Sequence, residues 1–403
     1  MIKEKLQKLG QEHLLKFENE LTESEKEALY NQIENLDFSY LEELGQKSKQ
    51  AGEISPIKSL TIDEIDRQKE NFKKIGLEVL SRQEVGALLL AGGMGTRLGS
   101  DNPKGMYNIG KTKEVYIFQR LIENLLSVVD ECGKPVPLFI MTSEKNNEQT
   151  IKFLEEKNYF GYDKNYVRFF VQDMAPCVDI NGKVLLEEKG RIATSPNGNG
   201  GWFTSLLNNK NAKEMLEKFN LKWLNIFAVD NVLQKIAGPV FVGATVGGGY
   251  EVGAKVIRKV DPYEKVGVMC NRNGRPSVVE YIDLTEDMAL QVDENGERVY
   301  NFGVILNYLF NVDLLYKIKD DKLPVHVVTK KVEYVDDNGE KVVPTEPNAH
   351  KFEMLCVDMV ELSSSCLPFE VVREKEFAPI KNKTGVDSVE SAQALLEING
   401  YTL

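Results

Sequence analysis

Residues 88–107 of this 403-residue chain read LLLAGGMGTRLGSDNPKGMY and contain its most informative pattern. The stretch begins inside the apolar run 85–91 (VGALLLA), which is typical of a strand buried on both faces of a parallel sheet. Glycines follow at Gly92, Gly93 and Gly95, where main-chain N–H groups could surround phosphate oxygens. The stretch predicts an α/β fold with an anion site after its first core strand.

Two common phosphate loops do not match this stretch. A P-loop requires G-x-x-x-x-G-K-[ST], but the residue five places after Gly93 is Leu98. A dinucleotide fingerprint requires G-x-G-x-x-G, and its third glycine position is also Leu98, with Gly99 one place late. No ribose-binding acid is recognisable either.

A third interpretation uses the whole stretch. The glycines let the backbone approach a ligand without a Cβ in the way and are expected to visit positive φ. Arg97 and Lys104 supply positive charge, and Pro103 stiffens the approach to Lys104. The remaining alternative is a glycine-rich turn that carries two surface cations.

The rest of the chain alternates apolar runs with helical patterns. This alternation predicts a mostly parallel sheet covered by helices on both faces, a doubly wound Rossmann-like arrangement. The expected strands are 136–141, 167–171, 224–229 and 240–246, and the expected helices are 114–128 and 150–157.

Two regions depart from this pattern. Residues 1–80 show helical periodicity, with a capping box at Thr22 and Glu25, and predict a helical N-terminal region before a larger domain at 81–403. Residues 250–350 carry short β-rich pieces joined by Asn-Gly turns at 273–274, 295–296 and 338–339. We expect antiparallel hairpins beside the main sheet there, with strands at 254–260, 266–270 and 277–282.

The composition excludes several classes of protein. Lys and Arg number 50 against 62 Asp and Glu, a net charge of −12, which argues against nucleic-acid binding. Five cysteines without a C-x-x-C pair and three scattered histidines favour neither disulfides nor a zinc site. With no signal peptide and no apolar stretch of 18 residues, we expect a cytoplasmic protein that does not contact membranes.

The stretch 88–107 resembles the signature of the UDP-sugar pyrophosphorylases. Its Met-Gly-Thr-Arg-Leu-Gly…Pro-Lys-Gly-Met-Tyr form is similar to the UDP-N-acetylhexosamine pyrophosphorylase branch. The resemblance spans roughly residues 60–400 and implies that 250–350 form the sugar-binding part. It also implies that the small C-terminal domain of eukaryotic-type relatives is absent, and we expect a monomer or a weak homo-oligomer.

The resemblance implies a uridylyltransferase that makes UDP-N-acetylglucosamine and pyrophosphate from UTP and N-acetylglucosamine 1-phosphate. It places Mg²⁺ on Asp230, which follows an apolar strand. A carboxylate at such a position can hold the ion against phosphate oxygens. It also places Gln172 on uracil, whose edge suits an amide because the amide is both donor and acceptor. The residues implied are Arg97, Lys104 and Lys381 for catalysis; Leu90, Ala91, Gly92, Gly93, Gln172, Gly198 and Lys351 for the nucleotide; and Asn199, Glu280, Tyr281 and Asn301 for the sugar.

Each of these residues also has an ordinary structural explanation. Asp230 could cap a helix at 232–237, Glu280 could be a solvated strand residue, and a single lysine usually lies at the surface. Phe302 replaces a small residue of the family pattern, which leaves UDP-glucose, UDP-galactose or broad UDP-sugar pyrophosphorylases as alternatives. A non-catalytic nucleotide-sugar binding protein is the alternative from another class.

Overall fold

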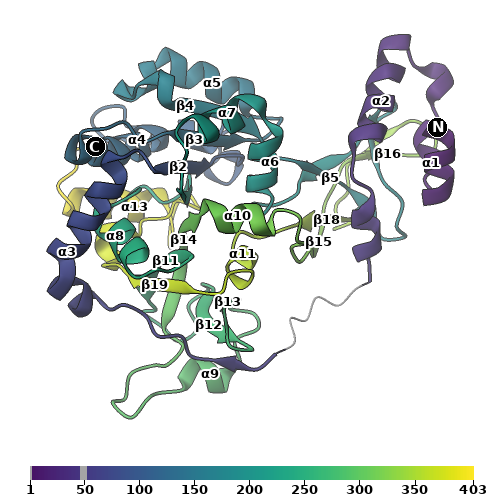
Figure 1. Cartoon of the computed structure of the whole chain (residues 1–403). Helices are drawn as coiled ribbons and strands as arrows, with labels where there is room; N and C mark the ends of the chain where they lie inside the picture. The colour runs from purple at the N-terminus through teal and green to yellow at the C-terminus, as the bar shows by residue number, and fades with distance from the viewer. Residues whose placement is uncertain (1, 46–51) are drawn as a thin grey trace. The chain divides into compact units, whose positions relative to one another are not determined.

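The computed structural model describes residues 2–45 and 52–403 and separates them into two compact units (Figure 1). Unit 1 contains residues 2–45, Gln172–Gly201 and Lys322–Leu355. Unit 2 contains residues 52–171, Trp202–Asp321 and Cys356–Leu403. The helices expected within 1–80 are divided between the units, because α1 (Ile2–Leu9) and α2 (Glu23–Asn35) belong to unit 1 and α3 (Ile62–Ser81) to unit 2.

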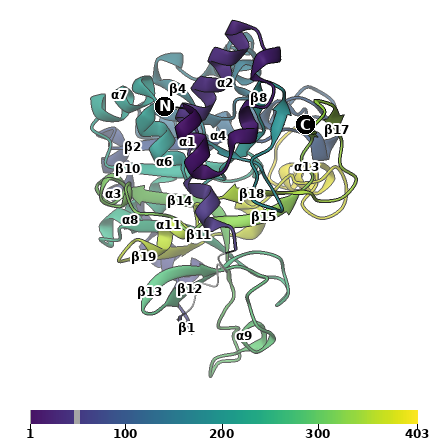
Figure 2. The same ribbon diagram turned by 90° about the vertical axis from the view of Figure 1, so that its right-hand side faces the viewer.

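Unit 2 is built on a ten-stranded mixed sheet flanked by helices, which confirms the α/β class (Figures 1 and 2). The strand order is β1-β12-β14-β10-β2-β3-β4, with β11 and β13 pairing to β14 and β12, and β19 to β11. The strands are β1 (Ile54–Ser55), β2 (Val85–Leu90), β3 (Leu138–Thr142), β4 (Val167–Val171), β10 (Trp223–Ala228), β11 (Val252–Arg258), β12 (Val268–Arg272), β13 (Arg275–Val279), β14 (Phe302–Asn311) and β19 (Cys366–Glu370).

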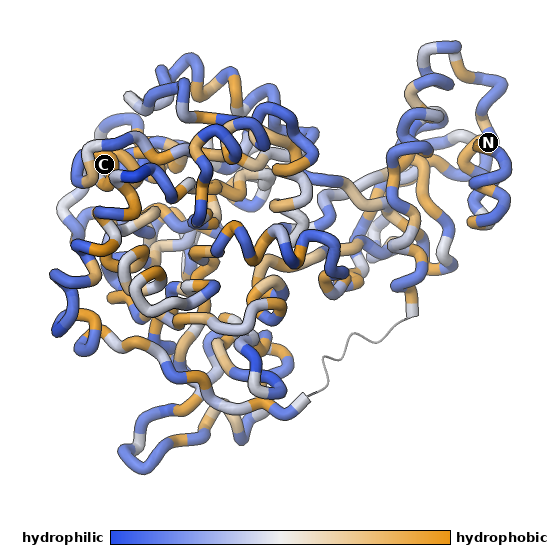
Figure 3. The backbone as a smooth tube through the Cα atoms, in the orientation of Figure 1, coloured by the Kyte–Doolittle hydropathy of each residue, from blue (hydrophilic) through white to orange (hydrophobic). Residues whose placement is uncertain are grey.

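Most of the longer helices of unit 2 carry one buried and one exposed face, whereas α8 (Pro239–Gly247) is buried over most of its length. Figure 3 shows hydrophilic and hydrophobic segments alternating along the backbone of the chain. The remaining helices are α4 (Ile117–Cys132), α5 (Asn147–Glu156), α6 (Trp202–Asn208), α7 (Lys210–Lys218), α8 (Pro239–Gly247), α9 (Glu286–Leu290), α10 (Val312–Ile318), α11 (Asp358–Glu361), α12 (Arg373–Glu376) and α13 (Val389–Ile398). None of the helices in the described residues is long and apolar enough to cross a membrane.

The strands β10, β2, β3 and β4 run parallel and end at the same level. Ala228 lies opposite Leu90, Leu90 opposite Met141, and Met141 opposite Phe170. Side chains that follow these strands therefore emerge at one edge of the sheet, where ligands of open α/β sheets bind.

Three expectations about unit 2 are wrong. Residues 240–246 form helix α8 instead of a strand, with Pro239 in its first turn, where proline favours a helix. Residues 232–237 form a loop, so Asp230 caps no helix there. The expected antiparallel hairpin at Asn273-Gly274 forms from β12 and β13, but with β11 it belongs to the main sheet instead of lying beside it, because the ten-residue β14 pairs with both β11 and β12.

Unit 1 has a hydrophobic core of its own, formed where α1 and α2 pack with small antiparallel sheets. The expected capping box of Thr22 and Glu25 starts α2. The strands are β5 (Met174–Pro176), β6 (Val178–Asp179), β7 (Leu186–Glu188), β8 (Arg191–Ile192), β9 (Thr194–Pro196), β15 (His326–Lys330), β16 (Tyr334–Val335), β17 (Lys341–Val342) and β18 (Ala349–Glu353).

Glycines allow α3 and α8 of unit 2 to touch through their backbones. A Cβ built at Gly76 would lie 1.9 Å from the Pro239 carbonyl oxygen, and one at Gly243 would lie 1.7 Å from that of Phe72.

We expect Gly76→Ala to lower the free energy of unfolding by about 1–3 kcal/mol, because the helices must move apart. Urea unfolding followed by circular dichroism measures it.

Lys74→Ala, at an exposed position of the same helix, is the control and should change the free energy of unfolding by less than about 0.5 kcal/mol. A Gly76→Ala protein as stable as the wild type would contradict the close packing of these helices.

Candidate functional site

The loop after β2 is held by main-chain hydrogen bonds within the loop and by a side-chain hydrogen bond from Asn146. The Gly95 N–H donates to the Asn102 carbonyl (2.8 Å), and the Lys104 N–H donates to the Gly93 carbonyl (3.1 Å). The side-chain amide of Asn146, which is fully buried, donates to the Ala91 carbonyl at 2.9 Å. The loop is therefore held in one shape before any ligand arrives.

Two main-chain donors of this loop remain available. In the described part of the chain, the N–H groups of Gly92 and Gly93 donate to no protein atom. A Cβ built at Gly93 would meet nothing within 4 Å, so no packing contact requires this glycine. The expectation of positive φ at Gly92, Gly93 and Gly95 is wrong, since within this loop Gly99 is the glycine that adopts it (φ +74°). Free donors beside open space suit an anionic ligand.

The position of Lys104 depends on Gly105, the residue that follows it. A Cβ built at Gly105 would lie 2.3 Å from the Phe118 ring, so only glycine lets this turn rest on α4. Burial lowers the pKa of the Lys104 amine, the Asp230 carboxylate raises it, and the charges of Arg97 and Lys381 lower it. The structure thus brings together all three cations expected to act in catalysis and the expected metal ligand.

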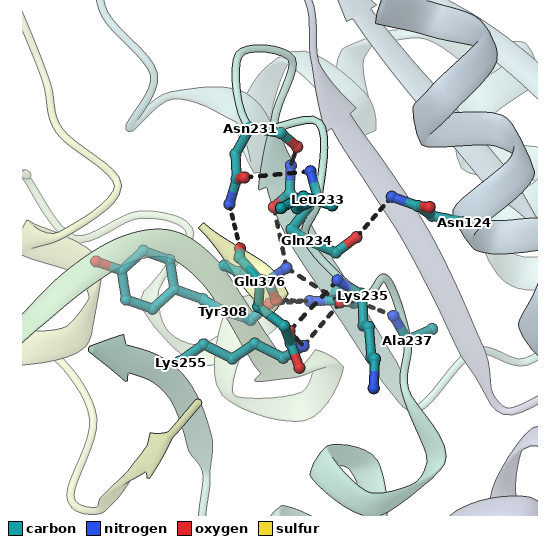
Figure 4. A network of polar contacts seen from close by, with 11 residues as sticks. Asn124, Asn231, Leu233, Gln234, Lys235, Ala237, Lys255, Tyr308 and Glu376 are labelled. Carbon is teal, nitrogen blue, oxygen red and sulfur yellow. Dashed lines mark hydrogen bonds and ion pairs between the residues drawn. The ribbon is translucent and has the colours of Figure 1, made fainter. Parts of the chain in front are cut away.

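Asp230 and Lys381 lie on two segments that are joined by main-chain hydrogen bonds. The Ile380 N–H donates to the Asp230 carbonyl (2.9 Å), and Asn231 pairs with Pro379 as an isolated bridge. The Asn231 side chain closes the junction, because its oxygen accepts from the Ala378 N–H (2.9 Å) and its amide donates to the Glu376 carbonyl at 2.8 Å (Figure 4). We call this junction of residues 230–232 with 376–380 the seam.

In this structure the Lys381 ammonium is paired with the Asp387 carboxylate. Its ammonium lies 3.0 Å from an oxygen of the Asp387 carboxylate. Asp387 also accepts from the Lys381 and Asn382 N–H groups through its carbonyl and adopts a φ of 53°. That left-handed conformation is uncommon for a residue other than glycine, and it turns the carboxylate-bearing residue back toward Lys381.

Three of the expected sugar-binding residues, Glu280, Tyr281 and Asn301, lie at the ends of strands β13 and β14 of unit 2. Glu280 comes after β13 and lies beside Gly267, where an added Cβ would be 2.8 Å from Val278 and 3.3 Å from a Glu280 carboxylate oxygen. Asn301 precedes β14, and its side-chain oxygen is buried without a hydrogen-bond partner in the described structure. An unsatisfied buried acceptor is costly, which suggests that a ligand supplies the missing donor. Tyr281 is 43% exposed.

Four expected residues belong to unit 1. Gln172 is buried, and its neighbour Asp173 accepts from the Asn197 N–H (3.2 Å). Gly198 adopts a φ of +88° and bridges Met354, and a Cβ there would lie 2.3 Å from the Met354 carbonyl oxygen. Lys351 lies on β18, three residues before Met354, and Asn199 directly follows Gly198. Unit 1 therefore places Gln172, Gly198, Asn199 and Lys351 on adjoining segments.

The donor set suits magnesium that arrives with a nucleotide. Among the described residues, no group of three or more His, Cys, Asp or Glu side chains could hold a metal. Mg²⁺ does not require one, because it usually keeps several waters and binds one or two carboxylates together with substrate phosphates. Asp230, beside Lys104, can provide such a carboxylate.

Three supporting residues are missing from the sequence-based list. Asn146 anchors the glycine loop, Asp387 pairs with Lys381, and Lys255 lies beneath the seam. For Lys255 a signal was present, since a lone lysine stood in the apolar run VGAKVI. Asn146 and Asp387 gave none, because asparagine and aspartate are common in loops.

The partly buried cation Lys104 is expected to cost stability. Its lowered pKa means that the unfolded chain holds this proton more tightly than the folded one. The penalty is full below the folded pKa and disappears as the pH rises from there toward 10.5, the ordinary value. We therefore expect Lys104→Met to unfold at a higher temperature than the wild type at pH 7, with a gap that narrows toward pH 10.

Thermal unfolding between pH 7 and pH 10 measures this gap. Lys113→Met, at an exposed position, is the matched control for the loss of one lysine. A Lys104→Met protein that melts below the wild type at pH 7 would show that this ammonium stabilises the fold.

Comparison with known proteins gives one consistent result. The model of the UTP–glucose-1-phosphate uridylyltransferase family matches residues 31–399. The UDP-N-acetylhexosamine pyrophosphorylase-like protein 1 of Mus musculus is 34% identical over 96% of this chain and 81% of its own length. The UDP-N-acetylglucosamine pyrophosphorylase of Saccharomyces cerevisiae is 36% identical over 85% of this chain and 74% of its own length.

A solved structure agrees with the sequence comparisons. The uridine diphosphate N-acetylglucosamine pyrophosphorylase of Trypanosoma brucei superposes with a TM-score of 0.85, at 27% identity, over 98% of this chain and 83% of that protein. The resemblance carried by residues 88–107 is confirmed. The chain belongs to the UTP–glucose-1-phosphate uridylyltransferase family, whose members are UTP:sugar-1-phosphate uridylyltransferases.

Proposed function

We propose that this UDP-sugar pyrophosphorylase joins UTP to N-acetylglucosamine 1-phosphate, giving UDP-N-acetylglucosamine and pyrophosphate reversibly. The observation that carries the proposal is the gathering of Arg97, Lys104 and Lys381 around the carboxyl ends of the parallel strands, in a chain of net charge −12. The choice of sugar follows the names of the relatives from Mus musculus and Saccharomyces cerevisiae.

The reaction needs charge neutralisation more than proton transfer. A phosphate monoester has a second pKa of about 6, so the attacking oxygen of the sugar phosphate is already an anion at neutral pH. This oxygen attacks the α-phosphorus of UTP in line, and pyrophosphate leaves with the bonding electron pair. Two polyanions must therefore be held together in the correct orientation.

The cations of unit 2 supply that stabilisation. Arg97 and Lys104 bind the triphosphate together with the free N–H groups of Gly92 and Gly93, which follow Leu90 and Ala91. Lys381 binds the α-phosphate and leaves Asp387 when the phosphate arrives. Asp230 would hold Mg²⁺, which when bound neutralises charge on the phosphate oxygens.

The neutral contacts give specificity. The carboxylate of Glu280 accepts hydrogen bonds from sugar hydroxyls, and Asn301 and Tyr281 contact the nucleotide-sugar. The buried Asn301 oxygen without a partner supports this assignment. For unit 1 we propose that Gln172 and the Gly198 backbone contact uracil, that Lys351 contacts a phosphate group, and that Asn199 contacts the sugar.

A second sugar remains a candidate because of one residue. Phe302 is partly exposed at the start of β14, and the Arg258 guanidinium lies 5.2 Å from the centre of its ring. A bulky ring next to Asn301 would narrow the space for an acetamido group, which favours glucose 1-phosphate as the alternative substrate.

A panel of sugar phosphates tests the reaction and the sugar. Pyrophosphate release from UTP should be fastest with N-acetylglucosamine 1-phosphate, compared with the 1-phosphates of glucose, galactose and N-acetylgalactosamine. Excess EDTA should abolish release, and full activity in EDTA would rule out the metal. Binding of UTP in calorimetry without turnover of any sugar phosphate would identify a binding protein instead.

The assigned cations make a separate prediction. We expect Lys381→Ala and Lys104→Ala each to lower kcat/KM by about 10²–10³-fold, the loss typical of one preorganised donor to a developing charge. Lys383→Ala, which removes an exposed lysine two positions from Lys381, is the matched control. Near-wild-type kcat/KM in both Lys381→Ala and Lys104→Ala would disprove these roles.

A further inference from the structure

Strand β11 carries a fully buried cation. The side chain of Lys255 is 1% exposed, and its ammonium lies 2.5 Å from a carboxylate oxygen of Glu376 and 2.8 Å from the Lys235 carbonyl oxygen. The ammonium also lies 5.3 Å from the centre of the Phe241 ring. Burial lowers the pKa of Lys255, and the Glu376 carboxylate opposes this effect.

Glu376, the ion-pair partner of Lys255, connects the two segments of the seam (Figure 4). Glu376 ends α12, five residues before Lys381, and its carboxylate accepts from the Lys235 N–H at 3.3 Å. Its main-chain carbonyl accepts from the Asn231 amide at 2.8 Å. One residue is thus bonded to the loop that carries Asp230 while it belongs to the segment that carries Lys381.

The ammonium of Lys255 completes a closed set of contacts. It bonds to the Asp230 loop through the Lys235 carbonyl and to the Lys381 segment through Glu376. From β11 it therefore fixes both segments against a rigid strand of the central sheet. Apart from Glu376, which ends α12, neither segment has regular secondary structure at the seam, so these side chains and the main-chain bond from Ile380 to Asp230 define the spacing there.

Stability alone explains this arrangement poorly. Removing two charges from water is expensive, and well-packed apolar residues often stabilise a protein as much as a buried ion pair does. A hydrogen-bonded ion pair is more directional than apolar packing, because it fixes both the distance and the orientation of two groups. Catalysis by positioning needs such precision, since a displacement of about 1 Å can cost on the order of 10²-fold in rate.

We propose that Lys255, Glu376 and Asn231 are positioning residues that fix Asp230 relative to Lys381. The inference rests on the proposed function, in which these two residues act on the phosphates of UTP. Lys255 and Glu376 touch no substrate themselves. They act by holding the seam, and their loss should disturb the reaction more than the fold.

The test compares activity with stability in variants of the full chain. We expect Lys255→Met to lower kcat at least tenfold, to change the KM for UTP less than threefold, and to lower the melting temperature. The double variant Lys255→Met/Glu376→Met leaves no lone buried charge, so its melting temperature should recover while its kcat stays low. Calorimetry of UTP binding with and without Mg²⁺ should show that the metal strengthens binding less in both variants than in the wild type.

Lys375→Met is the matched control, because it removes an exposed lysine of the same helix α12 and breaks no buried ion pair. It should leave the melting temperature nearly unchanged and keep kcat within twofold. If Lys255→Met does not fold, Glu376→Gln and Asn231→Asp preserve side-chain shape and should lower kcat at least fivefold.

Recovery of kcat together with melting temperature in the double variant would overturn the inference, because activity would then simply follow stability. Unchanged kcat in Glu376→Gln and Asn231→Asp would overturn it as well. A wild-type protein without turnover would reject the proposed function instead, so the two failures are distinguishable.

Discussion

The register of β2 against its two parallel neighbours is the constraint on which unit 2 depends. Because Leu90 lies opposite both Ala228 and Met141, the three strands end together, and the glycine loop, Asp230 and the Asn146 anchor all begin at one edge. A shift by one residue would turn every side chain of β2 to the other face of the sheet. The buried strand on each side of β2 makes such a shift very unfavourable.

Arg97, Lys104 and Lys381 lie near the carboxyl-terminal edge of the parallel strands, in a protein of net charge −12. Placing these positive charges close together costs folding free energy. Lys104 is partly buried and feels the charges of Arg97 and Lys381, with Asp230 as the opposing charge, which is an unfavourable place for an ammonium in the free protein. Under the proposed function, a bound triphosphate supplies further opposing charge next to Lys104. The free N–H groups of Gly92 and Gly93 and the unpartnered oxygen of Asn301 have the same character. Groups left unsatisfied in the folded chain are typical of a site organised for a ligand.

Local sequence patterns predicted those elements whose conformation depends on residues close together in the chain. The apolar run 85–91 became β2, and the glycine loop after it could be read from spacing alone. Residues 240–246 misled because an apolar run rich in valine fits a buried helix as well as a strand, and Gly243, which packs on the Phe72 backbone, gave no local sign of this. The loop 232–237 avoids a helix because Gln234 and Asn231 bond to main-chain groups of the loop and the seam. The Asn231 bond to Glu376 joins residues that are distant in sequence, and for the same reason the pairing of Lys255 with Glu376 could not be foreseen.

The seam also affects how the protein comes into being on the ribosome. The hydrogen bond between Asn231 and Ala378 joins residues 147 positions apart, so the loop with Asp230 leaves the ribosome long before the segment that holds it. At roughly 5–20 residues per second, the delay is on the order of ten seconds. During that interval the parallel strands can already pair, but the segment 376–380 that completes the seam has not yet been made. The nascent protein therefore becomes competent for chemistry only late in translation.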